Sequence, residues 1–295
     1  MRRCDLWGFP FDGAATLGWP GARYAPAKVR AALSWMKMRL EEGRIFSTEE
    51  DRILDVGADL LRDRGDVDVV PHDLVTSLDL CSAAVSDSVR SGSVPIVVGG
   101  DDSQLFATVR GFHDAVEGSV ALIHFDAHLD LLDESREQGR YSQSSGMRRC
   151  LELERLSPER SMQVAVRNFN FPSSDEVAKE SGLGRMTAAE FHSLGTHDAV
   201  AKIATRIRGA DHVVFSFDID AVDPAFAPGA GAHEPGGLTS RQALDAVRML
   251  APRCSGFAVA EVNPMTDVGD VTSTLAAYLV WSFAVYGAPD ASPSS

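Results

Sequence analysis

Residues 124–130 read His124-Phe125-Asp126-Ala127-His128-Leu129-Asp130 and directly follow the apolar run Val120-Ala121-Leu122-Ile123. A short apolar run of this kind is typical of a buried strand. Successive side chains of a strand point to opposite sides, so Asp126, His128 and Asp130 would leave the backbone on the same side. The pattern predicts a buried strand whose end presents two carboxylates and one imidazole together.

A second strand end with the same chemistry lies far downstream. The apolar run Phe215-Ser216-Phe217 leads into Asp218-Ile219-Asp220, again with two Asp at alternate positions. Side by side, the two strand ends would form an oxygen-rich pocket with a nitrogen donor, which suits hard or borderline divalent metals. The sequence therefore predicts a divalent metal site between segments that are remote in the chain.

The composition is typical of a globular protein with enough apolar content for a core, since 44% of the 295 residues are hydrophobic and 24% are charged. Without an internal linker rich in Pro, Ser or Gly, we expect one domain over 1–287 and a disordered tail at 288–295. The net charge of −14 argues against nucleic acid or an anionic membrane as a partner. It mildly favours a cationic substrate.

Neither export nor membrane insertion is expected. The segment 1–5 leads into a mixed polar strand without the apolar core of a signal peptide. No stretch approaches the ~18 uninterrupted apolar residues of a membrane span. The four cysteines are widely scattered, without a Cys-x-x-Cys pair: Cys4, Cys81, Cys150 and Cys254. We therefore expect reduced, buried thiols and a cytoplasmic location.

Strand and helix patterns alternate along the chain. Strands are expected at 6–9, 53–57, 94–98, 119–125, 162–166, 211–217 and 256–262. Helices are expected at 26–40, 73–90, from 104 onward, at 145–153, 196–209, after 239 and at 271–285. Such alternation predicts a parallel, doubly wound sheet with helices on both faces. In open sheets of this kind, ligands bind at the carboxyl ends of the strands.

Two further predicted strand ends carry acids at that edge, Asp102 in Gly99-Gly100-Asp101-Asp102-Ser103 and Glu261 near the end of 256–262. Carboxylates gathered there would repel one another, and a pair of divalent cations is the simplest relief. Asp102 is a candidate metal ligand or a helix cap beside Ser103, which is itself a candidate N-cap. We expect Asp101 to support the loop, and His124 to be a core residue or to stand behind the ligands.

These motifs resemble those of the ureohydrolase family, which includes arginases, agmatinases and guanidino-acid hydrolases. The matching segments are GGDDS at 99–103, HFDAHLD at 124–130, SFDIDAVDPAFAPGAGAHEPGGLT at 216–239 and AEVNP at 260–264. The resemblance covers nearly the whole chain and points to an agmatinase-like branch with GGDDS in place of GGDHS. It implies a three-layer α/β/α fold around a mainly parallel, eight-stranded sheet.

The resemblance also implies a two-metal site, usually with manganese and in some relatives nickel, that hydrolyses a guanidine to urea and an amine. The implied metal ligands are Asp102, Asp126, His128, Asp130, Asp218 and Asp220. Asp126 and Asp218 would bridge both metals, Asp130 would also orient the attacking hydroxide, and Glu261 would bind the guanidinium. Agmatine or a guanidino acid such as 4-guanidinobutanoate is the expected substrate, and a trimer or hexamer is expected by the same resemblance.

Two positions depart from the family pattern. Asp102 stands where most members have a metal-binding histidine, and Gln143 stands where many have a histidine thought to shuttle protons. Gln143 and Ser144 are expected near the substrate instead, and His233 is the candidate for proton transfer. Two alternatives stay open: an amidino hydrolase acting on a natural-product intermediate, and a non-catalytic metal-binding paralogue, which the missing histidine favours.

Overall fold

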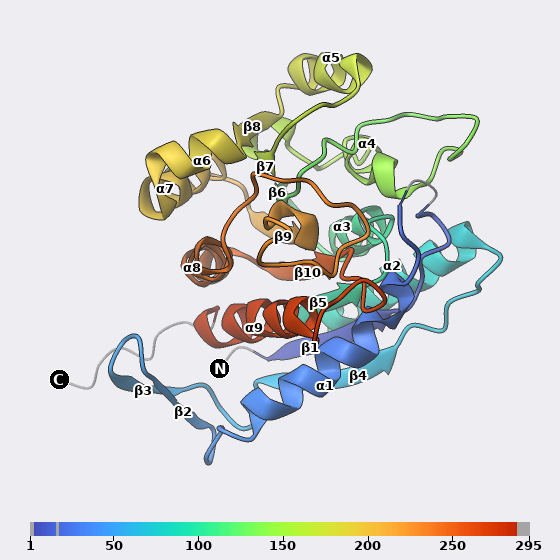
Figure 1. Cartoon of the computed structure of the whole chain (residues 1–295). Helices are drawn as coiled ribbons and strands as arrows, with labels where there is room; N and C mark the ends of the chain where they lie inside the picture. Colours follow the sequence, from blue (N-terminus) through green and yellow to red (C-terminus); the bar gives the residue numbers. More distant parts are fainter. Residues whose placement is uncertain (1–2, 16–17, 288–295) are drawn as a thin grey trace.

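Eight strands form the central sheet in the computed structural model, which describes residues 3–15 and 18–287 (Figure 1). The strands are β1 (Cys4–Phe9), β4 (Leu61–Asp66), β5 (Val94–Gly99), β6 (Val120–Phe125), β7 (Met162–Val166), β8 (Gly184–Thr187), β9 (His212–Asp218) and β10 (Gly256–Ala260). Their order is β4-β1-β5-β10-β9-β6-β7-β8, and each neighbouring pair is parallel. The predicted parallel sheet is confirmed, whereas the tail predicted at 288–295 lies outside the described residues.

Helices cover both faces of the sheet and complete the three-layer α/β/α fold. One face carries α1 (Ala25–Lys37), α6 (Ala188–Leu194), α7 (Thr196–Arg206), α8 (Ser240–Leu250) and α9 (Val271–Tyr286). The other carries α2 (Leu74–Arg90), α3 (Gln104–His113), α4 (Gly146–Cys150) and α5 (Pro172–Ser181). Within 3–15 and 18–287, no helix has the length and apolar character needed to cross a membrane.

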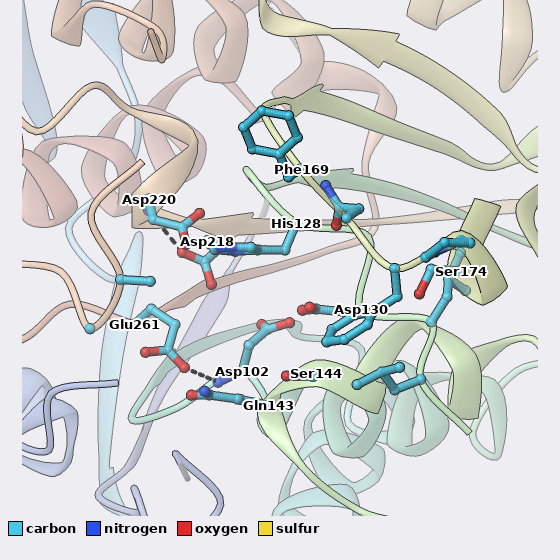
Figure 2. Close-up of a pocket in the computed structure, with 17 residues that line it drawn as sticks. Asp102, His128, Asp130, Gln143, Ser144, Phe169, Ser174, Asp218, Asp220 and Glu261 are labelled. Atoms are coloured by element: carbon cyan, nitrogen blue, oxygen red, sulfur yellow. Dashed lines mark hydrogen bonds and ion pairs between the residues drawn. The ribbon is translucent and has the colours of Figure 1, made fainter. Parts of the chain in front are cut away.

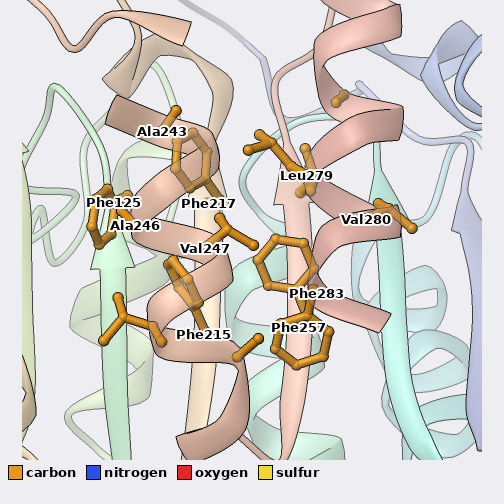
Figure 3. Close-up of a cluster of buried hydrophobic side chains, with 14 of the residues drawn as sticks. Phe125, Phe215, Phe217, Ala243, Ala246, Val247, Phe257, Leu279, Val280 and Phe283 are labelled. Atoms are coloured by element: carbon orange, nitrogen blue, oxygen red, sulfur yellow. The ribbon is translucent and has the colours of Figure 1, made fainter. Parts of the chain in front are cut away.

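Aromatic side chains fill the space between the central strands and helices α8 and α9 (Figure 3). Phe215 and Phe217 of β9 and Phe257 of β10 are fully buried. Phe257 stacks on Phe283 of α9 with ring centroids 4.5 Å apart, a favourable offset arrangement for large apolar rings. This packing anchors β9 and β10, whose ends carry the predicted acids.

Local capping signals set the start of several helices. Before α8, the Thr239 hydroxyl accepts from the Gln242 amide at 3.2 Å, and the Gln242 side chain accepts from the Thr239 amide at 3.0 Å. This reciprocal capping box sets the start of α8, the helix expected after 239. Ser103 does not cap α3, because its hydroxyl donates to Asp101 instead. The predicted Ser103 cap is therefore wrong.

Three parts of the chain differ from the sequence expectation. The strand expected at 53–57 exists as β3 (Arg52–Asp55), but it pairs antiparallel with β2 (Arg44–Ser47) in a separate hairpin. The edge strands β4 and β8 were not predicted, because the sequences LRDRGD and GRMT contain no apolar run. Edge strands need pairing on one side only and commonly carry charged residues.

Candidate metal centre

Four adjacent strands bring the predicted acids to one edge of the sheet. Asp102 follows β5, Glu261 follows β10, Asp218 ends β9 and Asp126 follows β6. The Glu261 amide donates to the Gly100 carbonyl at 2.9 Å, which joins the ends of β5 and β10. Acids that are remote in sequence are thus neighbours, because the carboxyl ends of parallel strands share an edge.

The backbone leaves strand geometry at the site. β6 ends at Phe125, so the predicted strand alternation does not extend through Asp126, His128 and Asp130. Asp130 has a φ of 49° and Glu261 a φ of 60°. A non-glycine residue in this left-handed region costs roughly 1–3 kcal/mol and persists only where the surroundings hold it. The fold therefore places two of the candidate catalytic residues in strained positions.

Backbone amides hold one oxygen of each of three aspartates. Asp126 accepts from the His128 amide, Asp218 accepts from the Asp220 amide at 2.8 Å, and Asp220 accepts from the Ala127 amide at 3.0 Å. Each carboxylate keeps a second oxygen that does not take part in these bonds. The amides therefore fix the orientation of the acids and leave oxygens for a further ligand.

A first group of possible ligands includes His124. One ligand atom from each of Asp102, His124, Asp126 and Asp130 lies within 4.8 Å of the others. His124 Nε2 is 3.2 Å from Asp126 Oδ2 and 3.5 Å from Asp102 Oδ2. His124 was expected in the core or behind the ligands. The signal that marks it as a possible ligand is its position near the end of β6, two residues before Asp126.

A second group consists of Asp126, His128 and Asp220, with Asp218 next to them. His128 Nδ1 is 3.0 Å from Asp220 Oδ2, and His128 Nε2 is 3.7 Å from Glu234 Oε1. Burial alone would lower the pKa of His128, but the neighbouring carboxylates of Asp220 and Asp126 raise it well above its usual range. Burial alone would raise the pKa of Asp220, yet the neighbouring His128 lowers it to about 2. Glu234 thus lies near the outer nitrogen of the imidazole, at more than hydrogen-bond distance.

The remaining acids are destabilised as anions. Burial, followed by repulsion from Asp126, raises the pKa of Asp102 and Asp130 well above the usual range. Burial likewise raises the pKa of Asp218 and Glu261, with smaller contributions from nearby carboxylates. Metal cations bound among these carboxyl groups would lower their pKa values and favour the ionised forms.

The residues present fit a pair of divalent metal ions. Both carboxylate oxygens of Asp102, Asp126 Oδ2 and both ring nitrogens of His124 are buried without a hydrogen-bond partner. Buried polar atoms rarely lack partners, so an unmet ligand is the natural explanation. Carboxylate oxygens with one or two imidazoles suit manganese and similar ions.

A cavity of about 440 Å³ opens beside these acids (Figure 2). Glu261 lines it, as do Gln143 and Ser144, the residues expected near the substrate. Glu261 Oε1 accepts from the Asp102 amide at 2.8 Å. His233 is exposed and lies outside this lining, with Nε2 2.7 Å from the Pro228 carbonyl. The geometry gives no support to a proton-transfer role for His233.

Sequence reasoning missed one wall of this cavity and one of its supports. Phe169, Asn170 and Phe171 line the cavity just after β7, where no site residue was predicted. Gln163 of β7 is buried, and its amide donates to the Leu129 carbonyl at 2.7 Å. No local pattern marks these residues, which reach the site only because β7 lies beside β6.

The model of the arginase family matches residues 2–286. This chain belongs to the arginase family. It is 34% identical over 278 residues to guanidinopropionase of Pseudomonas aeruginosa, covering 94% of this chain and 84% of the relative. It is also 34% identical over 274 residues to proclavaminate amidinohydrolase of Streptomyces clavuligerus, covering 91% of this chain and 83% of the relative.

Solved structures of arginase-family proteins share the fold. Formimidoylglutamase from Bacillus subtilis matches with a TM-score of 0.85 at 27% identity, over 97% of this chain and 87% of the other. Proclavaminate amidinohydrolase from Streptomyces clavuligerus matches with a TM-score of 0.81 at 30% identity, over 97% and 91% of the two chains. The chain is thus an arginase-family hydrolase of guanidino compounds, with an Asp/His cluster that can bind metal.

Proposed function

We propose that the chain uses two divalent metal ions to hydrolyse a linear guanidine to urea and an amine. The observation that supports this most strongly is the group of five aspartates and two histidines, most of them buried, several of which line a cavity together with Glu261. Manganese is the expected metal, with nickel as the second candidate. The agmatinase-like assignment is part of this proposal.

Each of the two groups of possible ligands would hold one metal ion. Asp102, His124 and Asp130 would hold one ion and His128 and Asp220 the other, with Asp126 and Asp218 available to both. When bound, such ions neutralise the carboxylates and make water a nucleophile near neutral pH.

The other steps belong to side chains in the cavity. Glu261 would bind the guanidinium through charge-assisted hydrogen bonds, which places the guanidinium carbon beside the acids. Asp130 would orient the attacking water and carry a proton to the departing amine. Gln143 cannot titrate, so we assign this transfer to Asp130, which lines the same cavity.

The first compounds to test follow from the activities for which the relatives are named. Agmatine and 4-guanidinobutanoate represent the agmatinase and guanidino-acid relatives. A guanidine on a natural-product intermediate is the second candidate, and the identity with proclavaminate amidinohydrolase favours it. All of these share the guanidinium that Glu261 would bind.

A urea-release assay tests the proposal. Protein loaded with manganese is incubated with a panel of linear guanidines, and both urea and the amine are quantified. We expect stoichiometric urea and amine from at least one compound. Protein with two bound metals and no urea from any guanidine would instead support a non-catalytic paralogue.

Assembly and location are further parts of the proposal. A homo-oligomer, trimer or hexamer, is carried over from the resemblance, and a cytoplasmic location from the cysteine pattern and the N-terminal sequence. Light scattering coupled to gel filtration measures the assembly directly. A monomer at micromolar concentration would contradict it.

A further inference from the structure

The cavity extends beyond the acids to an aromatic wall. Phe169 and Phe171 line the same cavity as Asp218 and Glu261, and Figure 2 shows Phe169 on the side of His128. Phe169 is 99% exposed and Phe171 is 54% exposed. When a ligand covers large apolar side chains beside a binding site, the apolar surface that is removed from water stabilises the complex.

Charge is confined to the inner part of the cavity. Its charged lining residues, among those described, are the ligand candidates Asp102, His128, Asp130, Asp218 and Asp220, together with Glu261. The other described lining residues are neutral: Leu131, Leu132, Gln143, Ser144, Phe169, Asn170, Phe171, Pro172, Ser174, Gly231 and Ala232. A charged group at the far end of a substrate would therefore find no opposite charge in this wall.

No arginine among the described residues lines this cavity, and two that lie near it in sequence, Arg167 and Arg149, are engaged elsewhere. Arg167 donates through Nη2 to the Asp220 carbonyl at 2.6 Å, and through Nε to the Glu234 carbonyl at 3.2 Å. Arg149, 1% exposed, forms an ion pair with Asp133. Neither guanidinium lines the cavity. A carboxylate on the substrate tail would find no cationic partner in this wall, and placing it against the aromatic rings would cost part of its hydration.

Neutral polar groups are nevertheless available beside the aromatic wall. The Gln143 side-chain amide and the Ser144 hydroxyl line the cavity, and neither has a hydrogen-bond partner among the described residues. The Asn170 side chain is already used, since it accepts from the Leu129 amide at 3.1 Å and donates to the Arg167 carbonyl at 3.2 Å. Gln143 and Ser144 can therefore pair with an uncharged carbonyl, amide or hydroxyl of a ligand.

We infer that the preferred substrate is a guanidine whose tail carries no charge: an alkyl or aryl group on Phe169 and Phe171, with or without an amide or hydroxyl that meets Gln143 and Ser144. This inference rests on the proposed guanidine hydrolysis and deepens it. Within that proposal, it ranks guanidines with neutral tails above agmatine and 4-guanidinobutanoate, whose tails end in an ammonium and a carboxylate.

Two matched pairs of guanidines isolate the charge of the tail. Pentylguanidine matches agmatine in shape without the ammonium, and 4-guanidinobutanamide matches 4-guanidinobutanoate without the carboxylate. The manganese-loaded protein is assayed for urea release, and binding of all four compounds is measured by calorimetry. We expect kcat/KM and affinity to be about tenfold or more higher for the neutral member of each pair.

The outcomes separate the two proposals. Urea from all four compounds with a charged member preferred in either pair overturns the tail inference and leaves guanidine hydrolysis standing. No urea, but tighter binding of both neutral members, overturns the hydrolysis and supports the tail inference. No binding of any of the four overturns both.

Variants of Phe169 test the wall itself. Phe169→Ala should raise KM for pentylguanidine several-fold with little change in kcat, and Phe169→Arg should shift preference toward 4-guanidinobutanoate by about tenfold or more. Phe46→Ala is the matched control, since Phe46 is 56% exposed on the β2–β3 hairpin, away from the cavity. Equal KM values for Phe169→Ala and Phe46→Ala would overturn the inference.

Discussion

His124 is the residue whose role the structure changes most. It lies fully buried on β6, and its ring nitrogens have no hydrogen-bond partner although Nε2 is 3.2 Å from Asp126 Oδ2. Asp102, which replaces the histidine of most family members, lies 3.5 Å away. An imidazole is thus present beside the first group of acids, supplied by a different position of the chain.

Replacing His124 with Asn should weaken metal binding. We expect the apparent affinity for manganese to fall at least tenfold, because the group that faces Asp102 and Asp126 is shortened. Metal content by atomic emission and a manganese titration followed by paramagnetic resonance measure this directly. His233→Asn, at an exposed histidine outside the cavity, serves as the control. If the His124→Asn variant still bound two manganese ions tightly, His124 would not be a metal ligand and would contribute only to core packing.

Replacing Glu261 with Gln should affect turnover but not metal content. Gln keeps the shape and can still accept from the Asp102 amide, which Glu261 does at 2.8 Å. It loses the charge that would pair with a guanidinium, so we expect kcat/KM to fall by roughly 100-fold or more. Steady-state urea release and metal analysis on the same sample test this. Unchanged kcat/KM would remove Glu261 from substrate binding.

At the scale of elements, the predicted strands were those with apolar runs. β5, β6, β9 and β10 are buried on both faces, so their sequences are nearly continuous in apolar residues. β4 and β8 lie at the edges and were missed for the opposite reason. The acids of the candidate metal site follow the four central strands. They could therefore be predicted although the two edge strands were missed.

The start of α9 depends on an aspartate outside the helix. Asp267 accepts from the Thr272 and Ser273 amides at 3.0 and 2.9 Å. Burial would raise the pKa of Asp267, but these hydrogen bonds lower it overall. A folded-state pKa below the unfolded value stabilises the protein above pH ~4, and this stability is lost as the pH falls through the folded pKa.

Asp267→Ala should therefore destabilise the protein by about 1 kcal/mol at pH 7, the usual effect of losing a cap. The difference from the unaltered protein should shrink at pH 3. Urea unfolding at the two pH values, in the presence of manganese and of a chelator, measures it. An equal difference at both pH values would show that the charge of Asp267 contributes nothing.

At the scale of the whole molecule, the acid cluster links metal content to stability. Burial and neighbouring carboxylates raise the folded-state pKa of Asp102, Asp130, Asp218 and Glu261. Groups with a raised pKa stabilise the folded state below their unfolded pKa of about 4, and this contribution is lost as the pH rises through the folded pKa. The metal-free protein should therefore lose stability above pH ~4.

Metal should stabilise the protein more as the pH rises, because binding removes the protons that compete for the same oxygens. We expect the difference in Tm between manganese-loaded and chelator-treated protein to be larger at pH 7.5 than at pH 5.5. Differential scanning fluorimetry in matched buffers measures it. A Tm difference that is the same at both pH values would contradict the assignment of these carboxylates to the metals.

The sequence alone determined the central strands, the parallel sheet and the acids at its edge, because apolar runs and alternate carboxylates are local patterns that the backbone period makes readable. Only the tertiary structure decided that His124 faces Asp102, that His233 lies outside the cavity and that Phe169 and Phe171 form its outer wall. These relations depend on which strands become neighbours and on how loops leave them. Packing across the whole sheet determines the order of the strands and the paths of the loops, and neither can be read from a short segment of sequence.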